Sequence, residues 1–228
     1  IDHSKDKPKA RNDQYRIITL DRDTTFVDTT LTIKSLYKYN YLRKDIFGLL
    51  PFTNEGQTYT VLNFGSQLPS NPLPEMGFKA KSFNFLKANQ INYYSVATPL
   101  TDLYYKTAME QGQTLDALIT VNLSEKLNFS ISYKGLRSIG KYINQLSSTG
   151  NFIITTSYAT KNNRYNANFH YTYQDVLNGE NGGLTDINDF ESNNSDYDNR
   201  ARIAVRQSDA NSLLSGKTSR FNIMAVIR

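Results

Sequence analysis

The sequence has no cysteine and no tryptophan, and its 228 residues include only two histidines, His3 and His170. The lack of cysteine excludes disulfides, thiolate metal sites and cysteine nucleophiles. Apolar residues make up 39% of the chain, and there is no apolar run of the roughly 18 residues that a membrane-spanning helix needs. A membrane β-barrel is not excluded, because its strands carry an apolar residue only at every second position.

No motif for catalysis or cofactor binding is present. The sequence lacks a glycine-rich phosphate loop, an HExxH zinc motif and a GxSxG nucleophile elbow. Several acids follow Asn178, and clustered acids can hold calcium through their oxygens, but the ordered spacing of a calcium loop is missing. A solvated acidic loop is the default interpretation. We therefore expect no enzyme activity, no cofactor and no metal.

The charge is mildly basic, with 26 Lys and Arg against 21 Asp and Glu and a net charge of +5. The basic residues are spread along the chain, and the aromatic residues follow a strand period without forming an RNA-binding motif. We expect no nucleic-acid partner.

The chain divides into two regions of different texture. Residues 1–100 are irregular, with short β-like runs at 15–20, 24–33 and 58–64, and four of the six prolines lie between Leu68 and Leu100. We expect residues 1–100 to form an amino-terminal segment that is either periplasmic or plug-like, and residues 101–228 to form the first part of a β-barrel.

Regular alternation begins after Pro99. Leu127, Phe129, Ile131 and Tyr133, for example, alternate with polar residues, which is a period of two. No helical repeat competes with this pattern. The sequence predicts about seven strands, near residues 101–109, 115–123, 127–133, 152–158, 165–173, 200–207 and 219–228.

The connections favour a membrane barrel over a soluble β-sandwich. The predicted strands exceed the usual five or six residues of soluble β-proteins. Tight turns at 124–126 and 160–163 alternate with long polar connections at 136–148 and 176–199, as in up-and-down outer-membrane barrels. Tyrosines near strand ends could form an interfacial girdle. The pattern predicts an all-β, antiparallel, up-and-down transmembrane β-barrel with its tight turns on the periplasmic side.

Strand parity assigns a lumen. If the apolar set faces lipid, the polar set lines the interior and its arginines would give a mild anion preference. The alternative is that these arginines pair with acidic groups elsewhere in the barrel or plug. The predicted lumen-facing residues are Asn128, Ser130, Ser132, Lys134, Arg164, Asn166, Asn168, His170, Arg200, Arg202, Arg206 and Arg220.

Four segments resemble a known family. These are DQYRIITLDRDTTFVDTTLTI at residues 13–33, NYLRKDIFGLLPF at 40–52, TPLTDLYYKT at 98–107 and YKGLRSIGKY at 133–142. They are similar to the putative porins of Bacteroidota. The resemblance implies an outer-membrane barrel of porin type and supplies no catalytic residues.

Members of that family are longer than this chain. Bacterial barrels also normally have an even number of strands, whereas about seven are predicted here. We therefore expect this chain to be the amino-terminal portion of a larger barrel, whose remaining strands or further chains pair with its edges.

The expected function is passive diffusion of small hydrophilic solutes through the cell outer membrane, with membrane lipid and solutes as partners. The first alternative is a structural or accessory barrel subunit of a larger secretion or uptake complex, with other envelope proteins as partners. The second is a soluble all-β binding module, for example for glycans.

Overall fold

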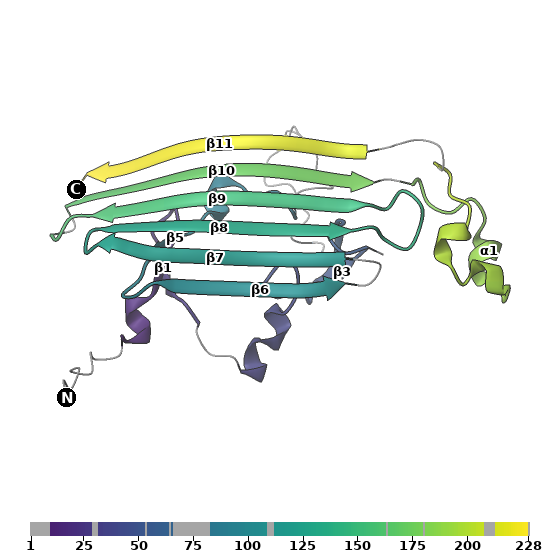
Figure 1. Cartoon of the computed structure of the whole chain (residues 1–228), viewed down its shortest axis with the longest axis horizontal. Coiled ribbons are helices and arrows are strands. Elements are labelled where there is room, and N and C mark those ends of the chain that lie inside the picture. The colour runs from purple at the N-terminus through teal and green to yellow at the C-terminus, as the bar shows by residue number, and fades with distance from the viewer. Residues whose placement is uncertain are drawn as a thin grey trace, which may run out of the picture.

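A computed structural model describes residues 10–28, 32–52, 54–63, 65, 83–108, 112–162, 164–179, 181–207 and 213–227. Its main element is a six-stranded antiparallel sheet in which each strand pairs with its neighbours in the sequence (Figure 1). The strands are β6 (Leu100–Ala108), β7 (Gly112–Ser124), β8 (Leu127–Ser138), β9 (Ser147–Ala159), β10 (Tyr165–Gly179) and β11 (Leu213–Ile227).

Short and long connections alternate along this sheet, as the sequence predicts. Residues 125–126 join β7 to β8, and residues 160–164 join β9 to β10. At the opposite end, residues 139–146 join β8 to β9, and residues 180–212 join β10 to β11. The described part of this last connection, which we call the α1 loop (residues 181–207), contains α1 (Ile187–Glu191), η6 (Ser195–Tyr197) and η7 (Arg200–Arg202). The first long connection is shorter than the predicted 136–148 because β8 and β9 extend into it, whereas the second is longer than the predicted 176–199 because the next long strand begins only at Leu213.

The strand predicted at residues 200–207 is wrong. Its first three residues form the 3-10 turn η7 (Arg200–Arg202), which Asn199 caps by accepting a hydrogen bond from the Ala201 N–H at 3.1 Å. A single antiparallel bridge between Leu184 and Val205 follows. Ile203 and Val205 are 0% and 4% exposed, so their alternation serves a small core within the α1 loop. The described residues therefore contain six of the seven predicted long strands.

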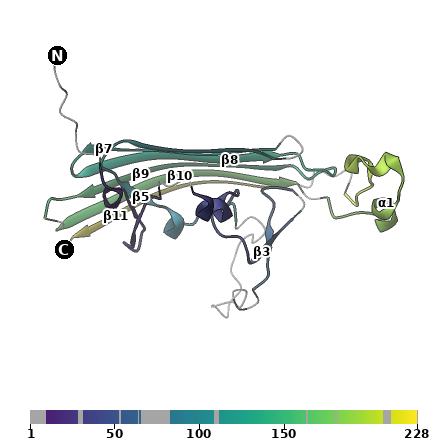
Figure 2. The ribbon, with the colours of Figure 1, turned by 90° about the horizontal axis from the view of Figure 1, so that it is seen from below.

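The amino-terminal segment lies on one side of the sheet (Figure 2). It contains the small sheet β2-β1-β5 and the hairpin β3-β4. Its short strands cover less than the predicted runs, and predicted residues 29–31 and 64 and the proline-rich stretch at 69–74 lie outside the described residues. Its elements are η1 (Asn12–Gln14), β1 (Arg16–Ile18), β2 (Thr24–Phe26), η2 (Ile33–Lys38), β3 (Leu49–Pro51), β4 (Tyr59–Val61), η5 (Ala88–Gln90) and β5 (Tyr93–Ser95).

The two faces of the large sheet differ in polarity. On the face under the amino-terminal segment, Asn128 and Ser130 are 3% and 2% exposed, whereas Leu103 and Ile119 on the opposite face are 67% and 57% exposed. This is the reverse of a soluble sheet, which buries its apolar face. The apolar core is small and lies between the segment and the sheet, around Tyr41, Ile91, Tyr93, Val96, Tyr104, Leu136 and Val176.

The expected all-β antiparallel architecture is confirmed. In the described residues the large sheet is open, with β6 and β11 at its edges, as expected for an incomplete barrel. No helix in the described part of the chain is long and apolar enough to span a membrane.

Candidate functional site on the polar face of the sheet

Strand register aligns polar residues in rows across the face that the amino-terminal segment covers. Thr120 lies opposite Ser130, Ser130 opposite Thr155, and Thr155 opposite His170. All four are at most 4% exposed. Ser130 Oγ donates to Thr120 Oγ1 at 2.8 Å. Because residues directly opposite in an antiparallel pair share a face, the polar alternation of each strand adds up to one continuous polar surface, which we call the polar wall.

The amino-terminal segment contacts this wall through side-chain amides. Gln174 Nε2 donates to the Leu86 carbonyl at 2.9 Å, and its Oε1 accepts from the Leu86 N–H at 2.8 Å. Asn54 Nδ2 donates to the carbonyls of Ser138 and Gln145 at 3.2 and 2.6 Å. Backbone groups away from water need such partners; Leu86 of the segment obtains them from Gln174, and the carbonyls of Ser138 and Gln145 obtain theirs from Asn54.

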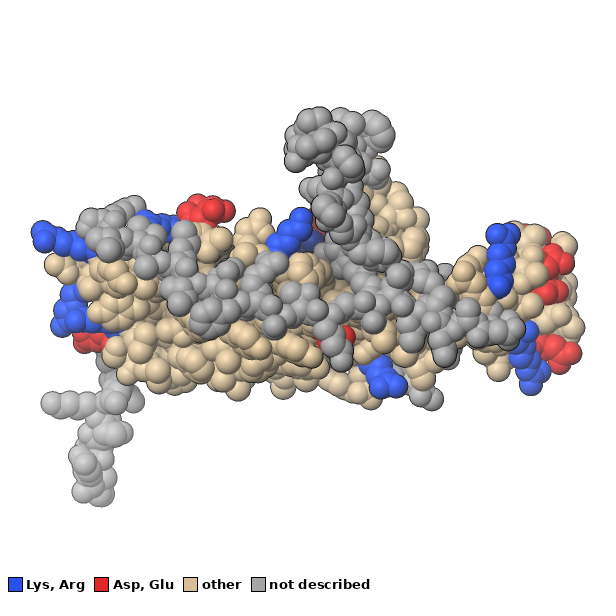
Figure 3. All heavy atoms as spheres, turned by 90° about the horizontal axis from the view of Figure 1, so that it is seen from above, with Lys and Arg blue, Asp and Glu red and all other residues tan. Residues whose placement is uncertain are grey.

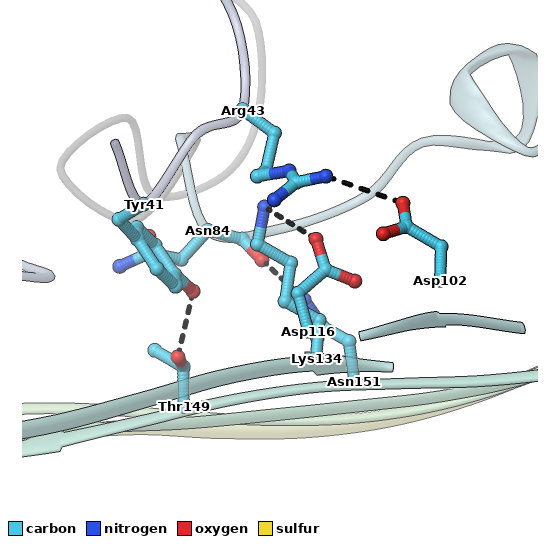
Figure 4. Close-up of polar contacts among 8 residues, drawn as sticks. All are labelled: Tyr41, Arg43, Asn84, Asp102, Asp116, Lys134, Thr149 and Asn151. Atoms are coloured by element: carbon cyan, nitrogen blue, oxygen red, sulfur yellow. Dashed lines mark hydrogen bonds and ion pairs between the residues drawn. The ribbon is translucent and has the colours of Figure 1, made fainter. Parts of the chain in front are cut away.

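Two further contacts involve residues near the start of β9, toward the long connections (Figure 4). Tyr41 Oη is 2.8 Å from Thr149 Oγ1. Asn151 Nδ2 donates to the Asn84 carbonyl at 3.0 Å, and Asn84 Nδ2 donates to the Gly56 carbonyl. The segment residues point toward the sheet and the wall residues point toward the segment, so the polar wall is the docking surface of the segment.

Buried tyrosines complete this contact. Tyr93 on β5 is 1% exposed, and its Oη lies 2.7 Å from Nδ1 of His170, which is 0% exposed. Burial raises the pKa of Tyr93 to about 12, because the phenolate would lose its hydration. Burial also raises the pKa of Tyr41 above its usual value. Both hydroxyls therefore stay neutral at physiological pH.

Charged residues gather on the β6–β8 side of the wall. Arg43 of the segment pairs with Asp102 of β6 at 3.2 Å, and its guanidinium carbon lies 4.6 Å from the Tyr104 ring centroid. Lys134 lies 4.0 Å from Asp116. Arg43 adopts a left-handed backbone with φ of 57°, a conformation that is costly for a side chain with a Cβ, and from there it reaches both partners.

A third ion pair joins the segment to β6, as Arg43–Asp102 does, but here the positive charge is on β6 and the negative charge is on the segment. Lys106 of β6 lies 3.9 Å from Glu55 of the segment. The Asp102 side chain is 55% exposed and that of Lys106 is 37% exposed. Solvent therefore reaches this side of the wall, whereas the part over β9 and β10 is covered.

The predicted lumen-facing residues of β8 and β10 share the covered face. Asn128, Ser130 and His170 are buried, and Ser132, Lys134, Asn166 and Asn168 are half-buried. Arg164 is exposed in the turn before β10. Arg220 lies on β11 opposite Thr172.

Three predicted wall arginines lie elsewhere. Arg200, Arg202 and Arg206 belong to the α1 loop, beyond the ends of the strands (Figure 1). Arg200 and Arg202 are on η7, where Arg200 lies over the Phe190 ring at 4.5 Å from its centroid and Arg202 is 3.4 Å from Asp196. The strand that would have turned them toward the wall does not form.

Sequence reasoning missed two groups of site residues. Ser147, Thr149 and Asn151 have the right parity, but the stretch up to residue 148 was predicted to be a loop, so extending the alternation backward from Phe152 would have found them. The docking residues of the segment, such as Tyr41 and Asn54, carry no local signal because their partners are 108 and 84 residues away.

The arrangement can form hydrogen bonds and carries charges of both signs. Within the described ranges, no three His, Asp or Glu side chains gather where they could hold a metal ion. Seen from the β11 side, coloured charged side chains of the described residues appear at one end of the sheet, in the α1 loop and at a few places between them (Figure 3).

Comparison with known proteins gives one result. A family model described as "Putative porin" matches residues 11–222, which is most of the chain. The chain belongs to this putative porin family. Neither the curated proteins nor the solved structures gave a significant match. The matched residues include the amino-terminal segment as well as most of the large sheet. The docked segment and the polar wall of this porin-family chain therefore both lie in the part of the chain that the family model covers.

Proposed function

We propose that this chain forms the wall of an outer-membrane pore through which small hydrophilic solutes pass by diffusion. One observation carries the proposal: the polar face of the sheet is turned inward, under the segment, while the large apolar side chains are exposed. Leu103, Ile119 and Leu123 are 57–67% exposed, whereas Thr120, Thr155 and His170 are at most 4% exposed. In a porin-type barrel, lipid covers the apolar face and water fills the polar side.

Strand length supports a membrane location. Strands β7 to β10 have 12 to 15 residues each, more than the 9 to 11 residues that cross a bilayer at a tilt. In bacterial barrels the tight turns are periplasmic and the longer loops extracellular. We accordingly place residues 125–126 and 160–164 in the periplasm and the α1 loop outside the cell.

The exposure of the apolar face of the sheet also argues against a soluble binding module. A soluble β-sandwich would cover Ile119, Ile131 and their neighbours with a second apolar layer, but these residues are 57% and 39% exposed. Leaving this apolar face in water would invite aggregation.

Planar-bilayer recording of the full-length protein tests the proposal. We expect stepwise currents that scale with salt concentration, that fall when neutral solutes small enough to enter the pore are added, and that do not fall when the added solutes are too large to enter. A mock preparation from cells without the protein is the control. If purified protein inserts into the bilayer but conducts in no condition, passive diffusion is wrong and the structural or accessory role in a larger envelope complex becomes the better assignment.

We further propose a mild preference of the pore for anions. Fewer arginines support this preference than the sequence analysis predicted. The three described ion pairs on the segment-covered side, Arg43–Asp102, Lys106–Glu55 and Lys134–Asp116, bring no net charge. Arg200, Arg202 and Arg206 lie in the α1 loop, where they can act only at the mouth of the pore. The reversal potential across a salt gradient measures the preference, and a cation-selective reversal would contradict it.

A further inference from the structure

We propose that the amino-terminal segment is a displaceable plug that lies in the lumen and narrows the passage. By the plug we mean residues 41–52, 54–63 and 83–96. This inference rests on the proposed function, because only a water-filled pore has a lumen to narrow. It goes beyond that function by assigning a role to a part of the chain that a diffusion pore does not require.

The plug contacts the wall along the length of the strands. At the end near the long connections, Asn54 binds Ser138. In the middle, Leu86 binds Gln174. Toward the tight turns, the Val96 N–H donates to Asn122 Oδ1 at 3.4 Å. Element β5 packs against β7, β8 and β9. A segment resting only at the mouth of a barrel would contact the strand ends alone.

Most of the wall residues that are buried under the plug are polar, beside the small apolar core around Ile91, Val96 and Leu136. Hydrogen bonds of the plug exchange readily for hydrogen bonds to water, since the net free energy of one such exchange is small. Among the described residues, the buried Oδ1 atoms of Asn84 and Asn151 and the Oγ atom of Ser147 lack a hydrogen-bond partner. Hydration after release would satisfy these atoms, which lowers the net free energy that holds the plug in place.

Two ion pairs join the plug to β6, one with the positive charge on the plug and one with the positive charge on β6. Arg43 of the plug meets Asp102 of β6, and Lys106 of β6 meets Glu55 of the plug. These groups are partly exposed, so each pair contributes little free energy but together they select one position. The plug covers the wall over β9 and β10, whereas the charged groups over β6 remain accessible to solvent. We therefore place the remaining passage on the β6 side.

Single-cysteine labelling tests the position of the plug, because the chain has no native cysteine. Full-length Thr155→Cys, Ser132→Cys and Ile119→Cys variants in lipid vesicles are treated with a membrane-impermeant maleimide. Thr155 is buried on the wall at 4% exposure and Ser132 is half-buried on the same face. We expect Thr155→Cys to react at least about tenfold more slowly than Ser132→Cys, since labelling requires local opening, and Ile119→Cys to be protected by lipid.

Release of the plug is tested by adding Asn54→Ala, which removes contacts of the plug without changing the sheet. We expect this substitution to accelerate labelling of Thr155→Cys and to leave that of Ser132→Cys nearly unchanged. Thr156→Ala, on the opposite face of β9, is the matched control. Retained heat-modifiable migration on gels shows that the variants keep the folded sheet.

Bilayer recordings of the same variants separate the two proposals. If Asn54→Ala raises both the conductance and the labelling rate at Thr155→Cys, both hold. Labelling that responds to Asn54→Ala without current in any variant supports displaceable docking of the segment on the wall but contradicts the pore, and with it a plug that narrows a passage. Current together with equal labelling rates at Thr155→Cys and Ser132→Cys overturns the plug and leaves the pore in place.

Discussion

Gln174 shows how single side chains of the wall hold the amino-terminal segment. Its amide uses one donor and one acceptor to bind both backbone groups of Leu86, as a neighbouring strand would. It is 1% exposed, so water cannot substitute for it in the docked state. This geometry makes the residue a sensitive probe of docking.

The first prediction concerns this amide. Gln174→Ala should weaken docking by about 2 kcal/mol, because the N–H and C=O of the half-buried Leu86 lose their partners. Limited proteolysis of the reconstituted protein, read as the rate of cleavage within residues 83–96, measures the change. Thr156→Ala should leave the rate unchanged, and equal cleavage of wild type and Gln174→Ala would contradict the prediction.

The second prediction concerns pH. Tyr93 has a folded-state pKa of about 12, against about 10 in an unfolded chain. The neutral hydroxyl is favoured in the docked state, so its contribution to docking is fully present below about pH 10 and is lost as the pH rises from about 10 to 12, by at most about 1.4 kcal/mol per pH unit.

Labelling of Thr155→Cys as a function of pH, corrected with Ser132→Cys for the reactivity of the thiolate, measures this loss. Tyr93→Phe should reduce the slope between pH 10 and 12, and the slope that remains comes from Tyr41, Tyr59 and Tyr94 of the same segment, whose pKa values are also raised by burial. An unchanged slope in Tyr93→Phe would show that Tyr93 does not titrate with docking.

Parity in the sequence identified Asn128, Ser130 and His170 as wall residues because alternation in a strand fixes the face of each side chain. The partners of the wall were not predictable in this way. Tyr93 meets His170 across 77 positions of the chain, and no local pattern encodes a contact between an irregular segment and a distant strand.

At the scale of elements, the long connections pack against the strand ends. The Gly179 N–H, at the end of β10, donates to the Leu146 carbonyl at 2.6 Å. Asn144 Nδ2 donates to the Gln207 carbonyl at 2.7 Å. The connection between β8 and β9 is thereby tied both to β10 and to the α1 loop.

The third prediction tests this packing. A Cβ at Gly179 would lie 2.5 Å from the backbone oxygen of Asn144, so the connection at 139–146 must shift. Gly179→Ala should destabilise the fold by about 1–3 kcal/mol. Urea unfolding in detergent measures the change. Gly48→Ala is the matched control, because a Cβ there meets nothing within 4 Å, and a Gly179→Ala variant as stable as this control would contradict the prediction.

The prediction of strands from the sequence succeeded where an alternating pattern was bounded by turn residues. It failed where the alternating pattern was the only evidence. Strands β7 to β10 were predicted because long alternation is bounded by turns. Ile203 and Val205 alternate in the same way but are buried within the α1 loop, where Asn199 caps a 3-10 turn. A short alternating run does not distinguish an extended strand from a turn with its own small core.

At the scale of the whole molecule, the sheet exposes its apolar face and covers its polar face. Residues Ile119, Ile131 and Ile154 lie opposite one another near the middle of three strands. If lipid covers this face, a charge placed there must be moved out of water, whereas a charge near a strand end can reach the headgroups.

The fourth prediction follows from this depth dependence. Ile131→Lys should destabilise the bilayer-inserted protein by about 2–4 kcal/mol, and Leu123→Lys, beside the turn after β7, by about 0–1 kcal/mol. Equilibrium folding into lipid vesicles measures both. Similar effects at the two positions, or an Ile131→Lys protein that is more stable and soluble without lipid, would contradict a lipid-facing surface.

The sequence by itself determined six long strands, the face of each residue in them and the alternation of tight turns with long connections, because these depend on neighbours in the chain and on a period of two. It did not determine what covers the polar face. The contacts of Tyr41, Asn54 and Leu86 with the wall join residues more than 80 positions apart. They exist only when the folded sheet brings its polar rows together and offers them to the amino-terminal segment, so the tertiary structure alone decided them.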